Sequence, residues 1–210
     1  MSPGKDKKAA SRDYFDRHAA SYERGGRFRA VQRPQVEALA WLGLRADDRL
    51  LDVGCGTGMA VRTAALGVAR AVGLDLSPQM IAEARRLAQG VAGAEFEVGD
   101  GEQLPFADAE FTAVLCTTSL HHYPQPARAI AEMARVLIPG GRVVIGDPNR
   151  DRFSIRLLDG FCRRFQQSHV RILNSGELEA AIRGAGLVPA GFQSLQRGGY
   201  MLALAHKPKR

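Results

Sequence analysis

The segment LLDVGCGTG, residues 50–58, is the most informative part of this 210-residue chain. An apolar run that is typical of a buried strand leads into Gly54, Gly56 and Gly58, and a helical pattern follows at 58–66. Glycine permits a tight turn and lets a ligand approach the backbone closely. The helix N-terminus adds unpaired N–H groups and a positive dipole end. This strand, loop and helix predict a nucleotide-type site at the carboxyl edge of a parallel sheet.

Two acidic residues indicate which nucleotide this site would take. Asp52 precedes the first glycine, where a carboxylate suits a cationic ligand group and repels a pyrophosphate. Asp75 ends the next predicted strand, where an acidic side chain can accept hydrogen bonds from both ribose hydroxyls. The dinucleotide fingerprint G-x-G-x-x-G would also need its third glycine at the position of Met59. The pattern therefore fits S-adenosyl-L-methionine (SAM) better than NAD.

Short apolar runs alternate with helical patterns from residue 49 onward. This alternation predicts an α/β fold whose mostly parallel sheet is covered by helices on both faces. Ser77 is the predicted N-cap of the second helix, with Pro78 at its first position. The expected strands are 49–54, 69–75, 94–99, 111–116 and 142–147, and the expected helices are 58–66, 77–89 and 125–137.

The two ends of the chain follow other patterns. A helix over 177–186, capped by Ser175, precedes two strands at 187–195 and 200–207. A Gly-Gly turn between these strands indicates a hairpin, so the sheet should have seven strands with the last one antiparallel. A helix at 31–42 precedes the first strand.

Basic residues are concentrated in three segments of a chain whose net charge is +7 and whose pI is near 9.8. The net charge is +5 for residues 1–33, +4 for residues 149–171 and +3 for residues 207–210, so the rest of the chain is acidic. Basic surfaces attract nucleic acid, anionic lipid or acidic small molecules. Short terminal charge runs can equally be solvated tails.

Composition excludes several classes of protein. With 45% hydrophobic and 24% charged residues, the chain is globular rather than disordered. Its apolar runs are shorter than the ~20 residues of a membrane span, and its N-terminus lacks the apolar region of a secretory signal. The widely spaced Cys55, Cys116 and Cys162 fit a reducing compartment rather than a disulfide framework. We expect a cytoplasmic protein with no bound metal.

Five motifs in order resemble the class I SAM-dependent methyltransferases, and more narrowly the type 11 methyltransferase domain. That family includes the ubiquinone/menaquinone-biosynthesis C-methyltransferases. The motifs run from Tyr14 to Asp147: YFDRHAASYE (14–23), LLDVGCGTG (50–58), VGLDLSPQMIAEAR (72–85), GDGEQLPFADAEF (99–111) and TTSLHHYPQPARAIAEMARVLIPGGRVVIGD (117–147).

The resemblance implies a Rossmann-like class I methyltransferase fold in a single domain, residues 1–210. Its parts would be a lid arm, a SAM-binding core, a substrate-cap insertion and a C-terminal helix with a β-hairpin. These parts would span residues 1–33, 34–148, 149–174 and 175–210, respectively.

The resemblance also implies a set of cofactor-binding residues. The methionine portion of SAM would meet Asp52, Gly54, Cys55, Gly56, Gly58, Cys116 and Thr117. The ribose and adenine would meet Asp75, Leu76, Met80, Asp100, Gly101 and Glu102. Tyr14 and Tyr22 would close over the cofactor. Leu76 and Met80 can equally be ordinary core residues.

The acceptor should lie where the strand at 111–116 ends. His121 and His122 follow that strand, and either could act as a base, cap the next helix or line the pocket. Asp147 ends the strand at 142–147, where it could orient the substrate or simply end the strand.

The insertion contains RFSIRLLDGFCRRFQQSHV (152–170), a basic amphipathic pattern. Such a helix can cover a substrate pocket, lie on an anionic membrane, contact RNA or simply pack on the domain. Arg156, Phe161 and Arg164 are the residues that we expect to reach the substrate.

We expect a SAM-dependent methyltransferase with a quinone-, lipid- or natural-product-like acceptor. The strand at 111–116 is followed by neither the Asn/Asp-Pro-Pro-aromatic pattern nor the Pro-Cys pattern of DNA methyltransferases. An RNA (tRNA) methyltransferase is the alternative, so nucleic acid is the less favoured partner. A non-catalytic SAM-binding module and an NAD-binding oxidoreductase are alternatives of another class. The sequence predicts neither the methylated atom nor the oligomeric state.

Overall fold

A computed structural model describes residues 3–209 and the side chains of 7–25 and 32–209. Its single sheet has the strand order β3-β2-β1-β4-β5-β7-β6. The strands are β1 (Arg49–Val53), β2 (Arg70–Asp75), β3 (Ala94–Val98), β4 (Phe111–Thr117), β5 (Leu137–Pro148), β6 (Val188–Leu195) and β7 (Tyr200–His206). β7 alone runs antiparallel to its neighbours β5 and β6. The predicted Rossmann-like α/β fold is therefore confirmed, and its strand order reverses between β1 and β4.

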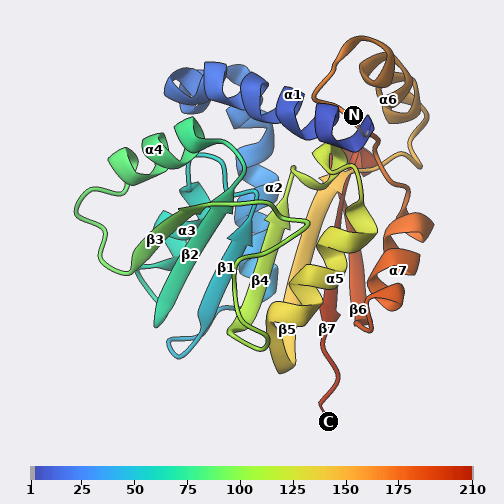
Figure 1. Ribbon diagram of the computed structural model, residues 1–210. Coiled ribbons are helices and arrows are strands. Elements are labelled where there is room, and N and C mark those ends of the chain that lie inside the picture. The colour runs from blue at the N-terminus through green and yellow to red at the C-terminus, as the bar shows by residue number, and fades with distance from the viewer. Residues whose placement is uncertain (1–2, 210) are drawn as a thin grey trace.

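Helices cover both faces of this sheet (Figure 1). The helices are α1 (Pro3–His18), α2 (Gly26–Leu42), α3 (Met59–Ala64), α4 (Pro78–Leu87), α5 (Pro126–Val136), α6 (Phe153–Phe165) and α7 (Ser175–Gly184). α2, α3 and α4 pack on one face, and α5 and α7 pack on the other. α1 lies across the carboxyl ends of the strands, and α6 projects beyond the body next to it (Figure 1).

The core follows the two-residue period of the strands. In β1, Leu51 and Val53 face α5 and α7, whereas Leu50 faces α2 and α3, and all three are fully buried. Each such side chain stabilises the fold by about 1.5–3 kcal/mol relative to an exposed one. Burial on both faces explains why the parallel strands read as continuous apolar runs.

Polar side chains set where two of the helices begin. Ser77 accepts a hydrogen bond from the Met80 N–H at 3.0 Å, as the sequence predicted for α4. The predicted cap of α7 was wrong by one residue, because Asn174 rather than Ser175 is its N-cap. Asn174 and Glu177 form a reciprocal capping box, which satisfies two N–H groups instead of one.

Two further segments differ from the predictions. β5 begins at Leu137 rather than 142, and the chain continues through Gly140 with a φ of +79° that glycine tolerates. The arm before residue 31 is largely helical, in α1 and the 3₁₀ turn η1 (Ala19–Arg24). Across the described part of the chain, no helix combines the length and apolar character needed to cross a bilayer.

Candidate active site

The loop after β1 is tied to the end of β2. The N–H groups of Gly54 and Cys55 donate to the Leu74 carbonyl oxygen at 2.8 and 3.0 Å. The two carboxylate oxygens of Asp75 accept hydrogen bonds from the Gly56 and Ser77 N–H groups, both at 2.9 Å. Each oxygen keeps a second lone pair for a ligand hydroxyl. Asp75 therefore shapes the loop and faces the site that the loop encloses.

Two loop positions require glycine, both for their backbone conformation and because no side chain would fit there. Gly54 and Gly58 each have a φ of +78°, in the left-handed region that side chains disfavour. A Cβ on Gly54 would lie 2.5 Å from the Ser119 hydroxyl, and one on Gly58 would lie 2.3 Å from the Phe96 ring. The loop can therefore pack this closely only without side chains.

Asp52 lies fully buried at the end of β1. Among the described residues, neither of its carboxylate oxygens has a hydrogen-bond partner. Burial raises its pKa to about 8, and the neighbouring Asp75 adds repulsion. Burial likewise raises the pKa of Asp75. Two neighbouring acids that resist ionisation, Asp52 in the core and Asp75 at the pocket wall, form a favourable place for a positively charged ligand group.

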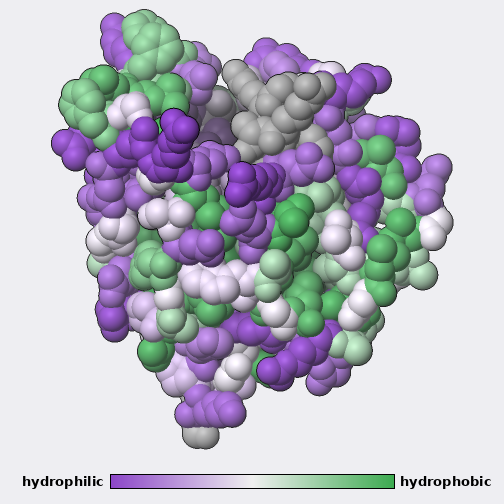
Figure 2. Space-filling model, turned by 180° about the vertical axis from the view of Figure 1, so that it is seen from behind, coloured by the Kyte–Doolittle hydropathy of each residue, from purple (hydrophilic) through white to green (hydrophobic). Residues whose placement is uncertain are grey.

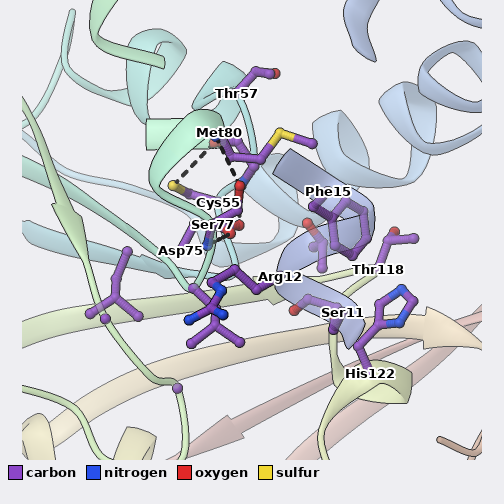
Figure 3. A pocket seen from close by; sticks show the side chains of 18 of the residues that line it. Ser11, Arg12, Phe15, Cys55, Thr57, Asp75, Ser77, Met80, Thr118 and His122 are labelled. Carbon is purple, nitrogen blue, oxygen red and sulfur yellow. Dashed lines mark hydrogen bonds between the residues drawn. The ribbon is translucent and has the colours of Figure 1, made fainter. Parts of the chain in front are cut away.

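A pocket of about 970 Å³, including its open mouth, lies between this loop and α1 (Figure 3). Its wall combines apolar side chains with a few polar and charged groups, as is usual for a small-molecule site. Residues of the predicted cofactor set that line it are Tyr22, Gly54, Cys55, Gly56, Asp75, Leu76, Met80, Asp100, Gly101 and Thr117.

The other five predicted residues lie outside the lining. Asp52 precedes the lining part of the loop in sequence, and Gly58 lies between the lining residues Thr57 and Met59. The Cys116 sulfur lies 3.2 Å from the Ser119 hydroxyl, and Glu102 accepts from the Gln125 N–H at 2.6 Å. Tyr14 packs against aromatic neighbours within α1.

α1 forms a wall of the pocket through residues that sequence reasoning did not name, although it expected a lid arm over residues 1–33. Ser11, Arg12 and Phe15 point from it toward the space above the glycine loop (Figure 3). Helical spacing alone does not show which body residues a helix will meet, so only its Tyr14 and the later Tyr22 were predicted. Phe15 also meets His122 edge-on, with ring centroids 5.1 Å apart.

Charged and polar groups hold the N-terminal arm to the pocket at three points. Asp16 accepts from the Ser77 hydroxyl at 2.5 Å, and the Thr57 hydroxyl donates to Glu23 at 2.8 Å. The Lys8 ammonium lies 2.5 Å from both Asp100 and Glu102. Burial opposes the charge on Lys8, but these two carboxylates outweigh it and raise its pKa.

His122 lies in the pocket wall with a defined tautomer. Its Nδ1 is 2.8 Å from the Ser168 carbonyl oxygen, which can only accept, so Nδ1 carries the hydrogen. Burial lowers the pKa of His122 well below its usual value, and the nearby His121 lowers it further. His122 is therefore neutral at physiological pH, with a lone pair on Nε2.

His121 and Asp147 form a pair behind His122. The His121 Nδ1 lies 2.8 Å from an Asp147 carboxylate oxygen, and Asp147 is fully buried. The two histidine rings are 4.1 Å apart between centroids. Neither His121 nor Asp147 is among the lining residues. The structure therefore brings both histidines and Asp147 together, with only His122 at the pocket surface.

Thr118 is a strained lining residue that the sequence did not reveal. Its φ of +54° is unfavourable for a β-branched side chain. Its N–H donates to the Gly146 carbonyl oxygen at 2.7 Å, and its hydroxyl lies 2.9 Å from that of Tyr200. These contacts fix the chain where β4 turns toward the histidines.

The three predicted substrate residues of the insertion lie elsewhere. Arg156, Phe161 and Arg164 are exposed on α6, and none of them lines the pocket. The amphipathic pattern correctly predicted a helix there but not which way its apolar side faces. The structure does not bring these residues to the site.

Residues 51–145 match the family model described as a methyltransferase domain, which is the type 11 domain. The chain is 34% identical over 187 residues to 27-O-demethylrifamycin SV methyltransferase of Amycolatopsis mediterranei (strain S699), covering 84% of this chain and 65% of that protein. It is also 34% identical over 140 residues to the demethylmenaquinone methyltransferase of Tropheryma whipplei (strain Twist), covering 65% of this chain and 58% of that protein.

A solved complex of the Haloferax volcanii Trm112 methyltransferase activator and a putative methyltransferase contains the same fold. The TM-score is 0.82 at 24% identity, covering 92% of this chain and 97% of that one. The chain spans 41–65% of the length of the first curated relatives that it matches. Residues 51–145 therefore match the type 11 methyltransferase domain, and the chain has the fold of solved proteins that are described as methyltransferases.

Proposed function

We propose that this protein transfers a methyl group from SAM to a small-molecule acceptor. The observation that carries the proposal is the buried, unpartnered Asp52 beside Asp75 at the glycine loop. A cationic amino-acid portion would offset the cost of ionising Asp52, and an adjoining ribose would use the free lone pairs of Asp75. An NAD pyrophosphate would oppose the ionisation of both acids and would gain no such contact.

The pocket has a place for each part of this cofactor. Gly54, Cys55 and Gly56 would underlie its methionine portion, and Leu76 and Met80 would flank its adenine. Asp100 would accept from the adenine amino group, in competition with the Lys8 ammonium that now lies 2.5 Å away. Bound SAM supplies an activated methyl group on a sulfonium centre.

The chain's own residues would position the acceptor and exclude water. Correct alignment of two reactants can lower a barrier by roughly 7–11 kcal/mol. α1 would act as the lid, because the three anchors of the N-terminal arm hold Phe15 over the pocket. The Nε2 lone pair of His122 would take the proton that a hydroxyl of the substrate loses when its oxygen receives the methyl group. His121 and Asp147 would hold His122 in place from behind.

The acceptor that we propose is a quinone-, lipid- or natural-product-like molecule. Two relatives at 34% identity are named for rifamycin-type and menaquinone-type substrates, which are both small molecules. The mixed polar and aromatic wall formed by Phe15, Thr118 and His122 suits a molecule with both a ring system and a hydroxyl.

Binding and transfer are tested separately. Calorimetric titration should show binding of SAM and its demethylated product, and no binding of NAD. Asp75→Asn should weaken SAM binding by about 10- to 150-fold, as expected for losing hydrogen bonds to a charged group. Asp47→Asn is the matched control, because Asp47 is an exposed acid away from the pocket. Unchanged affinity in Asp75→Asn would exclude the proposed ribose contact.

Methyl-labelled SAM incubated with a cell extract then tests the acceptor class. Label in the organic-soluble fraction supports the small-molecule proposal and provides a compound to identify. Label in a ribonuclease-sensitive precipitate would instead indicate RNA. Binding of SAM without any transfer would favour a non-catalytic module.

A further inference from the structure

The outward side of α6 is apolar although it faces solvent. Phe153, Leu157, Leu158, Phe161 and Phe165 are each between 49% and 68% exposed. Only Asp159 and Cys162 of this helix are buried against the body. Figure 2 shows the projecting segment, at the upper left, with hydrophobic and hydrophilic side chains gathered side by side. Contiguous exposed apolar surface of this kind marks an interaction site.

The spacing of these residues places them on one side of the helix. Phe153, Leu157, Phe161 and Phe165 follow one another at intervals of four, which keeps them along one face. The last two rings pack together with centroids 4.7 Å apart. The buried Asp159 and Cys162 occupy the opposite side, so the apolar face cannot turn inward while they stay in place.

Exposed arginines accompany this apolar face. Arg156, Arg163 and Arg164 are exposed, and within the described side chains none forms an ion pair. The one acid inside α6, Asp159, is buried and accepts from His169 at 2.8 Å. The exposed surface of α6 is therefore apolar and positively charged at once.

We propose that α6 docks the protein on an anionic phospholipid bilayer. A helix with aromatic and leucine side chains on one face and arginines beside them can lie in the headgroup region. There the apolar side chains leave water, and the arginines meet negative lipid headgroups. This proposal does not depend on methyl transfer, because no α6 residue lines the pocket.

Two other occupants fit this surface less well. A second copy of the chain, paired symmetrically through α6, would bring two positively charged faces together, with no exposed acid on either helix to offset the repulsion. RNA would pair with the arginines, yet it would leave the row of phenylalanines and leucines in water. Only an anionic bilayer satisfies both features of the face.

Vesicle co-sedimentation tests the proposal with the full chain. Vesicles of phosphatidylcholine alone are compared with vesicles containing half phosphatidylglycerol, at low and high NaCl. We expect binding to the anionic vesicles only, and weaker binding at high salt. Arg163→Gln should weaken it about fivefold, the effect of one basic residue near such a surface. Phe165→Ser should weaken it about tenfold or more, because a large apolar side chain stays in water.

Matched controls carry the same chemical changes elsewhere on the surface. Arg128→Gln removes an exposed arginine on α5, and Leu66→Ser removes an exposed leucine after α3. Both should bind vesicles like the unmodified protein. SAM affinity should be unchanged in all four variants, which shows that each is folded.

Three results would overturn the proposal. One is equal binding to neutral and anionic vesicles, or no binding to either. A second is that the α6 variants and the controls lose binding equally. A third is a dimer in sedimentation velocity that Phe165→Ser dissociates, without vesicle binding, which would assign the face to a second copy.

Discussion

The carboxyl edge of the sheet has two halves that are held in different ways. On one side, the glycine loop is fixed by backbone hydrogen bonds, by Asp75 and by glycines that neighbouring side chains crowd. On the other side, residues 149–174 leave β5 and return to α7 with most of α6 in solvent. Asp159 is the main polar anchor of α6, accepting from His169 and from the Ile172 N–H at 2.8 Å each.

The two halves should therefore open at different costs in free energy. The loop geometry is part of the folded core, so opening it should cost nearly the full stability of the domain. The insertion at 149–174 has few buried apolar contacts, so it should open at a lower cost in free energy. His122 lies where the two halves meet, because its ring lines the pocket and its Nδ1 donates to Ser168.

The largest expected effect comes from His122 at this junction. His122→Ala should lower kcat about 10²- to 10⁴-fold, the usual contribution of a positioned acid or base. SAM affinity should stay within a few-fold, because the glycine loop is untouched. Single-turnover kinetics with labelled SAM and the identified acceptor measure the first quantity, and calorimetry measures the second.

His206→Ala is the matched control, since His206 is exposed at the end of β7. It should leave both quantities unchanged. If His122→Ala keeps the full kcat, the substrate needs no base at this position.

Gly58→Ala tests the rigid half. The new Cβ would lie 2.3 Å from Phe96 in a backbone conformation with a φ of +78°. Strain and overpacking together should reduce the free energy of unfolding by about 2–4 kcal/mol. Urea denaturation measures this, with Gly90→Ala as control.

Gly90 also has a positive φ, +82°, but a Cβ there would meet open space. In Gly90→Ala, the free energy of unfolding should therefore fall only by the cost of placing alanine at a positive φ, about 1–2 kcal/mol. Equal losses in the two variants would mean that Phe96 moves aside and the loop is not tightly packed.

The pH dependence of SAM binding probes Asp52. With its pKa near 8 in the free protein, Asp52 carries a proton at neutral pH. A cationic ligand group prefers the carboxylate, so binding expels that proton and affinity should rise about tenfold per pH unit from 6 to 8. Above 8 the affinity should fall again, because an α-amino group loses its charge near that pH. Asp52→Asn should remove this slope in calorimetric titrations, and a slope that persists would assign it to another group.

Asp52 should also shape the stability of the ligand-free protein. Folding raises its pKa from 3.8 to about 8, so between these values the native state holds more protons than the unfolded chain. Its contribution to stability therefore falls as the pH rises across that window. Asp52→Asn should flatten this part of the stability profile.

The smallest expected effect lies in the loosely held half. Gly160 is inside α6, and a Cβ there would meet open space. Gly160→Ala should stabilise the helix by about 0.5–1 kcal/mol. Amide hydrogen exchange within α6 should slow about two- to fivefold, starting from a protection below that of the sheet amides. Amides of α6 that are as protected as those of the sheet would show that α6 unfolds together with the sheet.

Local sequence rules predicted the sheet and the glycine loop. Alternation of apolar runs and helices gave the parallel strands, and Gly54, Asp75 and Ser77 act through neighbours close in sequence or on the adjacent strand. Such positions can be predicted because the strand, the turn and the cap each have a characteristic pattern.

Contacts between distant segments could not be predicted in the same way. Lys8 meets Asp100 only because α1 docks over the strand ends, and the sequence does not give that docking. The strained φ of Thr118 depends on its bonds to Gly146 and Tyr200, which the fold alone brings near. For α6, the pattern shows two faces but not which of them meets the body.

The two ends of the α6 excursion meet, since the Arg150 N–H donates to the Leu173 carbonyl oxygen at 3.1 Å. The insertion therefore begins and ends at one place on the body, and its return segment is held further by hydrogen bonds to His121 and His122. Loop-closure entropy depends only weakly on length, so an insertion of another size or sequence could occupy the same point at little cost. Relatives could thus diverge here by exchanging one piece, while the sheet and its glycine loop stay the same.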